Sequence, residues 1–163
     1  MEKNNYLFHD FDNIDFLNLF DPYHREIKKF IVDLDKECTL KAIKKSKIVD
    51  FDTSKYSDIL NLINSNKCKD ILNRIIKEED TIKFINLLKE RDSSFLREVH
   101  RGYSIEEIFE SVKDNNYHPV LFLELNKKHY IIDGRTRFYC SLFLKQPVKM
   151  RMISDTELNK NCK

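Results

Sequence analysis

The last third of the chain changes its hydrophobic period several times, and this succession constrains the fold more than any other feature. Ser104 and Glu107 form a capping box, in which the serine side chain accepts from the amide of residue 107 and the glutamate reaches back. Helical spacing follows in four apolar residues: Ile105, Ile108, Phe109 and Val112. The helix is expected to end before His118, because a residue that precedes proline is disfavoured in the α region.

Two strands, a helix and a third strand are expected after this first helix. Apolar β-forming residues predict strands at 120–125 and 129–133, joined by a tight hairpin loop at 126–128. Pairs of apolar residues four apart predict a helix over residues 136–145. Apolar and charged residues alternate over 148–153, which is typical of a half-buried strand. The order helix, strand, strand, helix, strand predicts the α+β class.

The first hundred residues have mainly helical spacing. An amphipathic helix is predicted from His24 onward, a short strand within 46–51, and about three short helices within 55–90. No linker rich in proline, glycine or serine divides the chain. We therefore expect a helical N-terminal region, residues 1–100, packed on a core of residues 101–163 in one compact domain.

Composition and charge limit the compartments and partners that are expected for the protein. The chain has 163 residues and a net charge of +2, which neither demands nor excludes a polyanionic partner. Its apolar runs are far shorter than the roughly 20 residues of a membrane-spanning helix, and the N-terminus lacks the pattern of a secretory signal. These features predict a cytoplasmic protein without a membrane partner, in a reducing environment. The four cysteines are far apart in the sequence, so neither a disulfide nor a zinc site is expected.

A glycine placed between a predicted strand and a predicted helix is the candidate for a binding site. The chain has only two glycines, and Gly134 follows the strand that ends at Asp133. Glycine permits backbone conformations that other residues resist and allows a ligand to approach the main chain closely. The amide groups at the start of the next helix favour an anion there. Arg135 and Arg137 add guanidinium groups that match phosphate oxygens, and Thr136 adds a hydroxyl, so the turn is a candidate phosphate cradle.

The same residues fit a simpler interpretation, a strand-to-helix turn with two solvated arginines. The order of elements around the turn favours the first interpretation. The segment from about Ser104 to Ser154 resembles the ParB/sulfiredoxin-like superfamily, whose members carry a helix, a strand introduced by proline, a strand leading into a glycine-arginine turn, a helix and a short strand. The corresponding stretches here are "SIEEIFESVKDNNYHPVLFLEL", "HYIIDGRTRFYCSLFLK" and "QPVKMRMIS".

The resemblance implies a small mixed sheet with helices, preceded by the helical N-terminal region, and a site that binds nucleotide phosphates. It places Gly134, Arg135, Thr136 and Arg137 against the phosphates, with His118 and Pro119 facing the same pocket. It implies a nucleoside triphosphate such as CTP or ATP as the ligand, with any Mg²⁺ held by the phosphates and no metal site of the protein's own. Asp133 and Glu26 are the candidate acid–base groups if the protein hydrolyses the nucleotide or transfers a phosphoryl group. Whether it does so, as an NTPase or a phosphotransferase, stays open.

The setting implied by the resemblance is plasmid partition, a phage or another mobile element. Departures from the family keep other functions open. The position where sulfiredoxins carry a catalytic cysteine holds Arg135, and no helix-turn-helix pattern is evident. A first alternative is a non-catalytic regulator or inhibitor that binds DNA or a protein. DNA binding would use a basic patch in which four further residues join the turn: Arg97, Arg101, Lys149 and Arg151. A second alternative is a ParB-like nuclease. The sequence does not give the oligomeric state.

Overall fold

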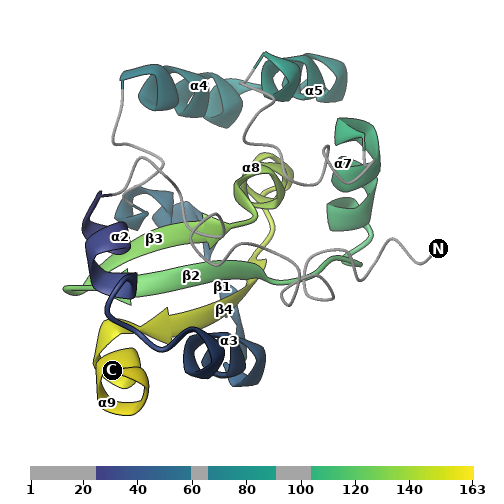
Figure 1. The fold of residues 1–163 in the computed structure, drawn as a ribbon. Helices are drawn as coiled ribbons and strands as arrows, with labels where there is room; N and C mark the ends of the chain where they lie inside the picture. The colour runs from purple at the N-terminus through teal and green to yellow at the C-terminus, as the bar shows by residue number, and fades with distance from the viewer. Residues whose placement is uncertain (1–24, 60–65, 91–103) are drawn as a thin grey trace.

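The structure is a computed structural model, and it describes residues 25–59, 66–90 and 104–163 (Figure 1). The described helices are α2 (Arg25–Ile31), α3 (Lys36–Lys45), the 3-10 helix η2 (Thr53–Asp58), α4 (Asn66–Lys77), α5 (Thr81–Lys89), α7 (Ile105–Lys113), α8 (Arg135–Leu144) and α9 (Asp155–Cys162). The described strands are β1 (Ile48–Phe51), β2 (Val120–Leu125), β3 (Lys128–Asp133) and β4 (Val148–Ser154). The prediction of the α+β class is confirmed.

The described strands form one four-stranded mixed sheet in the order β1-β4-β2-β3. β2 and β3 are an antiparallel hairpin, whereas β4 runs parallel to β2, with Val120 opposite Met150. Two neighbouring parallel strands need a connection that crosses back along the sheet, and here β3 and α8 supply it. β4 also pairs antiparallel with β1, so it has a partner strand on each side.

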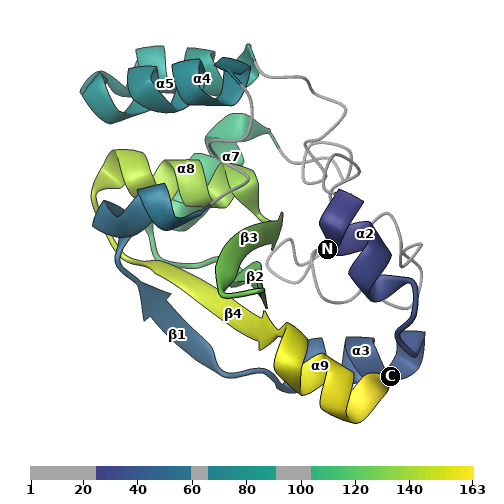
Figure 2. The same cartoon turned by 90° about the vertical axis from the view of Figure 1, so that its left-hand side faces the viewer.

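Helices cover both faces of the sheet (Figures 1 and 2). Residues of α4, α5, α7 and α8 share one apolar cluster with Val120 and Phe122 of β2. Residues of α2, α3 and α9 share a second cluster with Leu121 and Leu123 of the same strand. Successive side chains of a strand point to opposite faces, so β2 must be apolar at nearly every position to fill both clusters.

Most of the elements predicted after residue 104 are confirmed. Ser104 Oγ accepts from the amide of Glu107 at 3.0 Å and the reciprocal capping contact is present. The strand predicted within 46–51 is confirmed as β1. Within 55–90, two of the predicted helices are confirmed as α4 and α5. The first begins as the 3-10 helix η2, after which Ile59 forms an isolated bridge with His129, and its remaining residues, 60–65, lie outside the described residues.

Helix α9 was not predicted, although a signal for it exists. Ser154 caps the helix by accepting from the amide of Glu157 at 3.2 Å. The serine and glutamate have the same spacing as the capping box at Ser104. Only Leu158 and Cys162 of this helix are buried, so its hydrophobic period is too short to be recognised.

In the parts of the chain that the structure describes, no helix is both long enough and apolar enough to cross a membrane.

Candidate functional site

The turn between β3 and α8 has the backbone geometry that only glycine adopts readily. β3 ends at Asp133, and Gly134 follows with φ 101° and ψ 27° as the N-cap of α8. Gly134 has no side chain that could cap the helix. The first amide groups of α8, at the positive end of the helix dipole, therefore receive no side-chain cap from residue 134. The amide of Phe138 donates to the carbonyl of Gly134 at 2.9 Å, which closes the first turn.

Arg137, three residues later, lies entirely inside the protein. Its guanidinium Nη1 donates to the carbonyl oxygens of His118 and Pro119, the latter at 3.3 Å. Nη2 lies 3.7 Å from Oδ2 of Asp133, and the side chains of Arg137 and Asp133 are 0% and 7% exposed. Arg137 therefore ties the loop before β2 to the end of β3. The two segments that the resemblance assigns to one pocket are neighbours in space.

The guanidinium of Arg137 also explains why residue 134 is glycine. A Cβ atom added to Gly134 would lie 2.5 Å from Nη2 and 2.9 Å from Cζ of Arg137. The close approach that the sequence predicts for a ligand is thus made by the protein's own arginine. Both the backbone conformation and the lack of a side chain are required at this position.

Replacing Gly134 with alanine is expected to lower the free energy of unfolding by about 2–4 kcal/mol, because a strained backbone and a displaced guanidinium add together. Urea unfolding measures the effect. The matched control is Lys145→Gly at the other end of α8, where Lys145 has φ 55°. This control is expected to be neutral or to stabilise by up to about 1 kcal/mol, since glycine relieves the positive φ. A Gly134→Ala protein as stable as the parent would show that Arg137 does not pack against residue 134 as described.

The remaining residues of the turn differ in exposure. Thr136 is buried, whereas Arg135 at the first position of α8 is half-buried. Arg135 is therefore the turn's cation with a surface that a solute can reach. An anion at this helix start would contact the Arg135 side chain and the positive end of the α8 dipole. Arg137 would stabilise the turn from inside the protein.

Two other cations predicted to contact DNA act within the fold. Nζ of Lys149 donates to the carbonyl of Asn115 at 2.8 Å and lies 5.1 Å from the centre of the Tyr117 ring. Nη1 of Arg151 donates to the carbonyl of Ser46 at 2.6 Å, and burial lowers the pKa of this guanidinium. These two side chains of β4 therefore stabilise the positions of Asn115 and Ser46, which belong to neighbouring segments.

Three candidate residues remain, Arg97, Arg101 and Glu26. Arg97 and Arg101 lie outside the described residues, as does the side chain of Glu26. Helix α2, which contains Glu26, packs on the face of the sheet opposite to α8. Within residues 25–59, 66–90 and 104–163, no three histidine, cysteine or acidic side chains gather in a way that could hold a metal ion.

The expectation that the cysteines form no disulfide is wrong. Cys38 of α3 and Cys162 of α9 are bonded, with Cα atoms 5.4 Å apart across a sequence separation of 124 residues. Spacing along the chain says nothing of spacing in the fold, and α3 and α9 pack side by side on the same face of the sheet (Figure 2). Cys140 is buried and takes no part in a disulfide.

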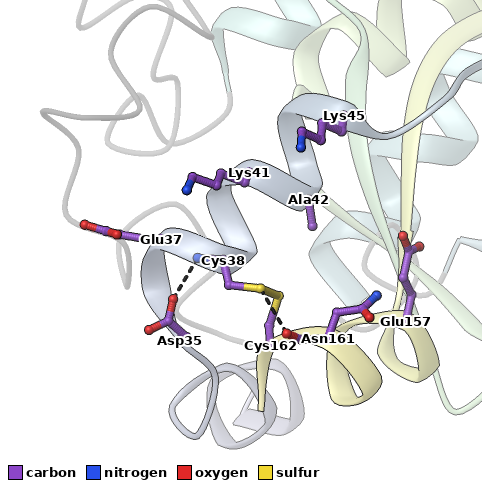
Figure 3. A pocket seen from close by; sticks show the side chains of 9 residues that line it. All are labelled: Asp35, Glu37, Cys38, Lys41, Ala42, Lys45, Glu157, Asn161 and Cys162. Carbon is purple, nitrogen blue, oxygen red and sulfur yellow. Dashed lines mark hydrogen bonds between the residues drawn. A yellow bond between two sulfur atoms is a disulfide. The ribbon is translucent and has the colours of Figure 1, made fainter.

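A groove of about 470 Å³ lies between α3 and α9, and the disulfide forms part of its wall (Figure 3). The groove was not predicted, because three of its nine lining residues belong to α9, a helix that was not predicted. It lies on the face of the sheet opposite to α8, so it is separate from the Gly134 turn.

Comparison with known proteins adds no further assignment: no protein-family model, curated protein or solved structure matches this chain. The described residues define a class by fold alone, an α+β protein in which a mixed sheet lies between two layers of helices.

Proposed function

We propose that the protein binds a nucleoside triphosphate through its phosphates at the Gly134 turn, as its resemblance to the ParB/sulfiredoxin-like superfamily implies. The observation that carries the proposal is the left-handed Gly134 at the N-cap of α8, beside the loop that ends at His118 and Pro119. A strand that leads through glycine into a helix start is a favourable place for phosphate oxygens.

In this proposal the two arginines have different roles, whereas the sequence analysis placed both of them against the phosphates. Arg137 positions the turn, because its guanidinium is buried against Asp133 and the carbonyls of His118 and Pro119. Arg135 contacts the phosphates, because it is the turn's half-buried cation. Mg²⁺ would arrive with the nucleotide and be held largely by its phosphates.

We propose binding, rather than turnover, as the primary activity. The carboxylate of Asp133, which the sequence suggests as an acid–base group, forms an ion pair with Arg137 at 3.7 Å. The neighbouring guanidinium favours the charged form of this carboxylate, which makes Asp133 a weaker proton acceptor. Any hydrolysis or phosphoryl transfer would then rest on positioning and charge neutralisation.

The test is a thermal-shift and calorimetric comparison of CTP, ATP and GTP, each with and without Mg²⁺. One of them is expected to raise the melting temperature in a concentration-dependent way, because a ligand that binds only the folded state stabilises it. Arg135→Ala is expected to weaken this binding by about 10- to 100-fold, the usual value of a hydrogen bond to a charged group. Arg74→Ala on the exposed face of α4 removes the same charge elsewhere and is expected to leave binding unchanged.

The outcome separates this proposal from the alternatives. If no nucleotide shifts the melting temperature, the chain does not bind nucleotides, and a non-catalytic regulator that binds DNA or a protein becomes the better proposal. The DNA alternative has less support from the described residues, since Arg137, Lys149 and Arg151 all contact backbone carbonyls of the protein itself. Equal binding by Arg135→Ala and the parent would place the nucleotide elsewhere.

A further inference from the structure

The disulfide between Cys38 and Cys162 is reachable from solvent through the groove between α3 and α9. It lines the groove between α3 and α9, where the side chains of Lys41 and Ala42 lie beside it (Figure 3). Cys38 is half-buried, whereas Cys162 is only 3% exposed. A dissolved thiol that enters the groove therefore meets the sulfur of Cys38 first.

Helix α9 has few other contacts to hold its end in place. It is eight residues long, and of its side chains only Leu158 and Cys162 are buried. A helix of this length is not stable by itself in water. Its first turn is fixed by the Ser154 cap and by the amide of Asn126, which donates to Oδ2 of Asp155 at 2.9 Å.

The last turn of α9 depends on residue 162. The carbonyl of Cys162 accepts from the amide of Asp35 at 2.7 Å, and the disulfide joins the same residue to α3. Since the remaining residues of that turn, 159–161, are exposed, the turn has no other buried side chain to anchor it. Cutting the disulfide leaves this backbone hydrogen bond, the buried Cys162 side chain and the contact between Sγ of Cys38 and the carbonyl of Asn161 at 3.2 Å.

We propose that the Cys38–Cys162 disulfide is a thiol–disulfide exchange site, and that its reduction by a small-molecule thiol releases the last turn of α9 from α3. A thiolate attacks Sγ of Cys38, forms a mixed disulfide there and expels Cys162 as a thiolate that takes up a proton. A second thiolate attacks the external sulfur of the mixed disulfide and expels the Cys38 thiolate. Two external thiols become one external disulfide, and the protein gains two electrons and two protons.

The groove does not select strongly for charge. Its lining includes two lysines, Lys41 and Lys45, and three carboxylates, those of Asp35, Glu37 and Glu157. Access is therefore set by size rather than by sign, and reduced glutathione is a suitable probe. A disulfide that small thiols can reach is of the labile, regulatory kind rather than a permanent cross-link.

The test is hydrogen exchange, followed by mass spectrometry, on the full chain before and after treatment with glutathione under native conditions. Reduction is expected to speed amide exchange in residues 159–162 by about tenfold or more, because local opening no longer breaks a covalent tie. Over short labelling times, the amides of β2 at the centre of the sheet are expected to stay protected in both forms, because they exchange only when the whole domain unfolds. Peptide mapping of the intermediate is expected to find glutathione on Cys38 and not on Cys162.

Three results would overturn the proposal. The first is free thiols at Cys38 and Cys162 in protein kept under air, and the second is reduction that occurs only in denaturant. The third is equal exchange of residues 159–162 in the oxidised and reduced protein. The double variant Cys38→Ser/Cys162→Ser is the control, and it is expected to exchange like the reduced protein and to ignore glutathione. Slow exchange in this variant, as in the oxidised parent, would also contradict the proposal.

Discussion

Replacing Arg137 with methionine is expected to lower the free energy of unfolding by about 3–5 kcal/mol, the usual effect of breaking a buried ion pair. Methionine keeps most of the length and apolar volume of the side chain, so the loss is mainly one of charge and hydrogen bonds. Asp133, only 7% exposed, would lose the cation 3.7 Å from its carboxylate. The carbonyls of His118 and Pro119 would lose a donor. Equilibrium unfolding in urea, compared with the parent, measures the change.

Two further variants make this prediction specific. Arg74→Met removes an arginine whose ion pair with Glu90, at 3.2 Å, has side chains 49% and 57% exposed. Its effect is expected to lie within about 1 kcal/mol of zero, because surface ion pairs contribute little. The double variant Arg137→Met/Asp133→Asn is expected to be more stable than Arg137→Met alone, since it also removes the buried carboxylate that has lost its cation. If Arg137→Met and Arg74→Met have equal effects, the guanidinium does not hold the turn.

Loss of the Cys38–Cys162 disulfide is the second large effect, and about 4–5 kcal/mol of unfolding free energy is expected to go with it. The cross-link spans 124 residues, so it removes much of the conformational freedom of the unfolded chain. The measurement is urea unfolding of the oxidised protein with and without a strong reductant. The reduced form is expected to unfold at a lower urea concentration and with a larger dependence on urea, because its unfolded state is more expanded.

The control for this effect is the Cys38→Ser/Cys162→Ser protein. Its stability is expected to match that of the reduced parent and to be the same with and without reductant. A parent protein whose unfolding does not respond to reductant would contradict the presence of the cross-link in solution. This global measurement is independent of the local opening at α9, because exchange reports the opening of one turn and urea reports the unfolding of the whole domain.

The sequence predicted those parts of the fold that short-range chemistry decides. The capping box at Ser104, the hairpin of β2 and β3 and the glycine before α8 each depend on residues within a few positions of one another. The strand at 46–51 could be located by its β-forming residues, but not its partner. β1 pairs with β4, about a hundred residues away, and no pattern inside either strand specifies that pairing.

The strand-to-helix turn at Gly134 was predicted correctly, but the direction of its arginine side chains could not be predicted. Nothing near Arg137 in the sequence shows that its guanidinium turns inward, because its acceptors are carbonyls 18 and 19 residues earlier. The disulfide was missed for the same reason, since its two cysteines are neighbours only after the sheet has formed. In both cases tertiary packing decides which group a side chain contacts, and the spacing of residues along the sequence does not predict that packing.

The position of β4 in the sheet has a consequence for how the protein is made. β4 is the last of the described strands, yet it lies inside the sheet, between β1 and β2. During synthesis β1 therefore emerges about a hundred residues before the strand that covers its edge. We expect the nascent chain to remain without a completed sheet until residue 154 has left the ribosome, with the hairpin of β2 and β3 formed first and β1 joining only when β4 lies beside it.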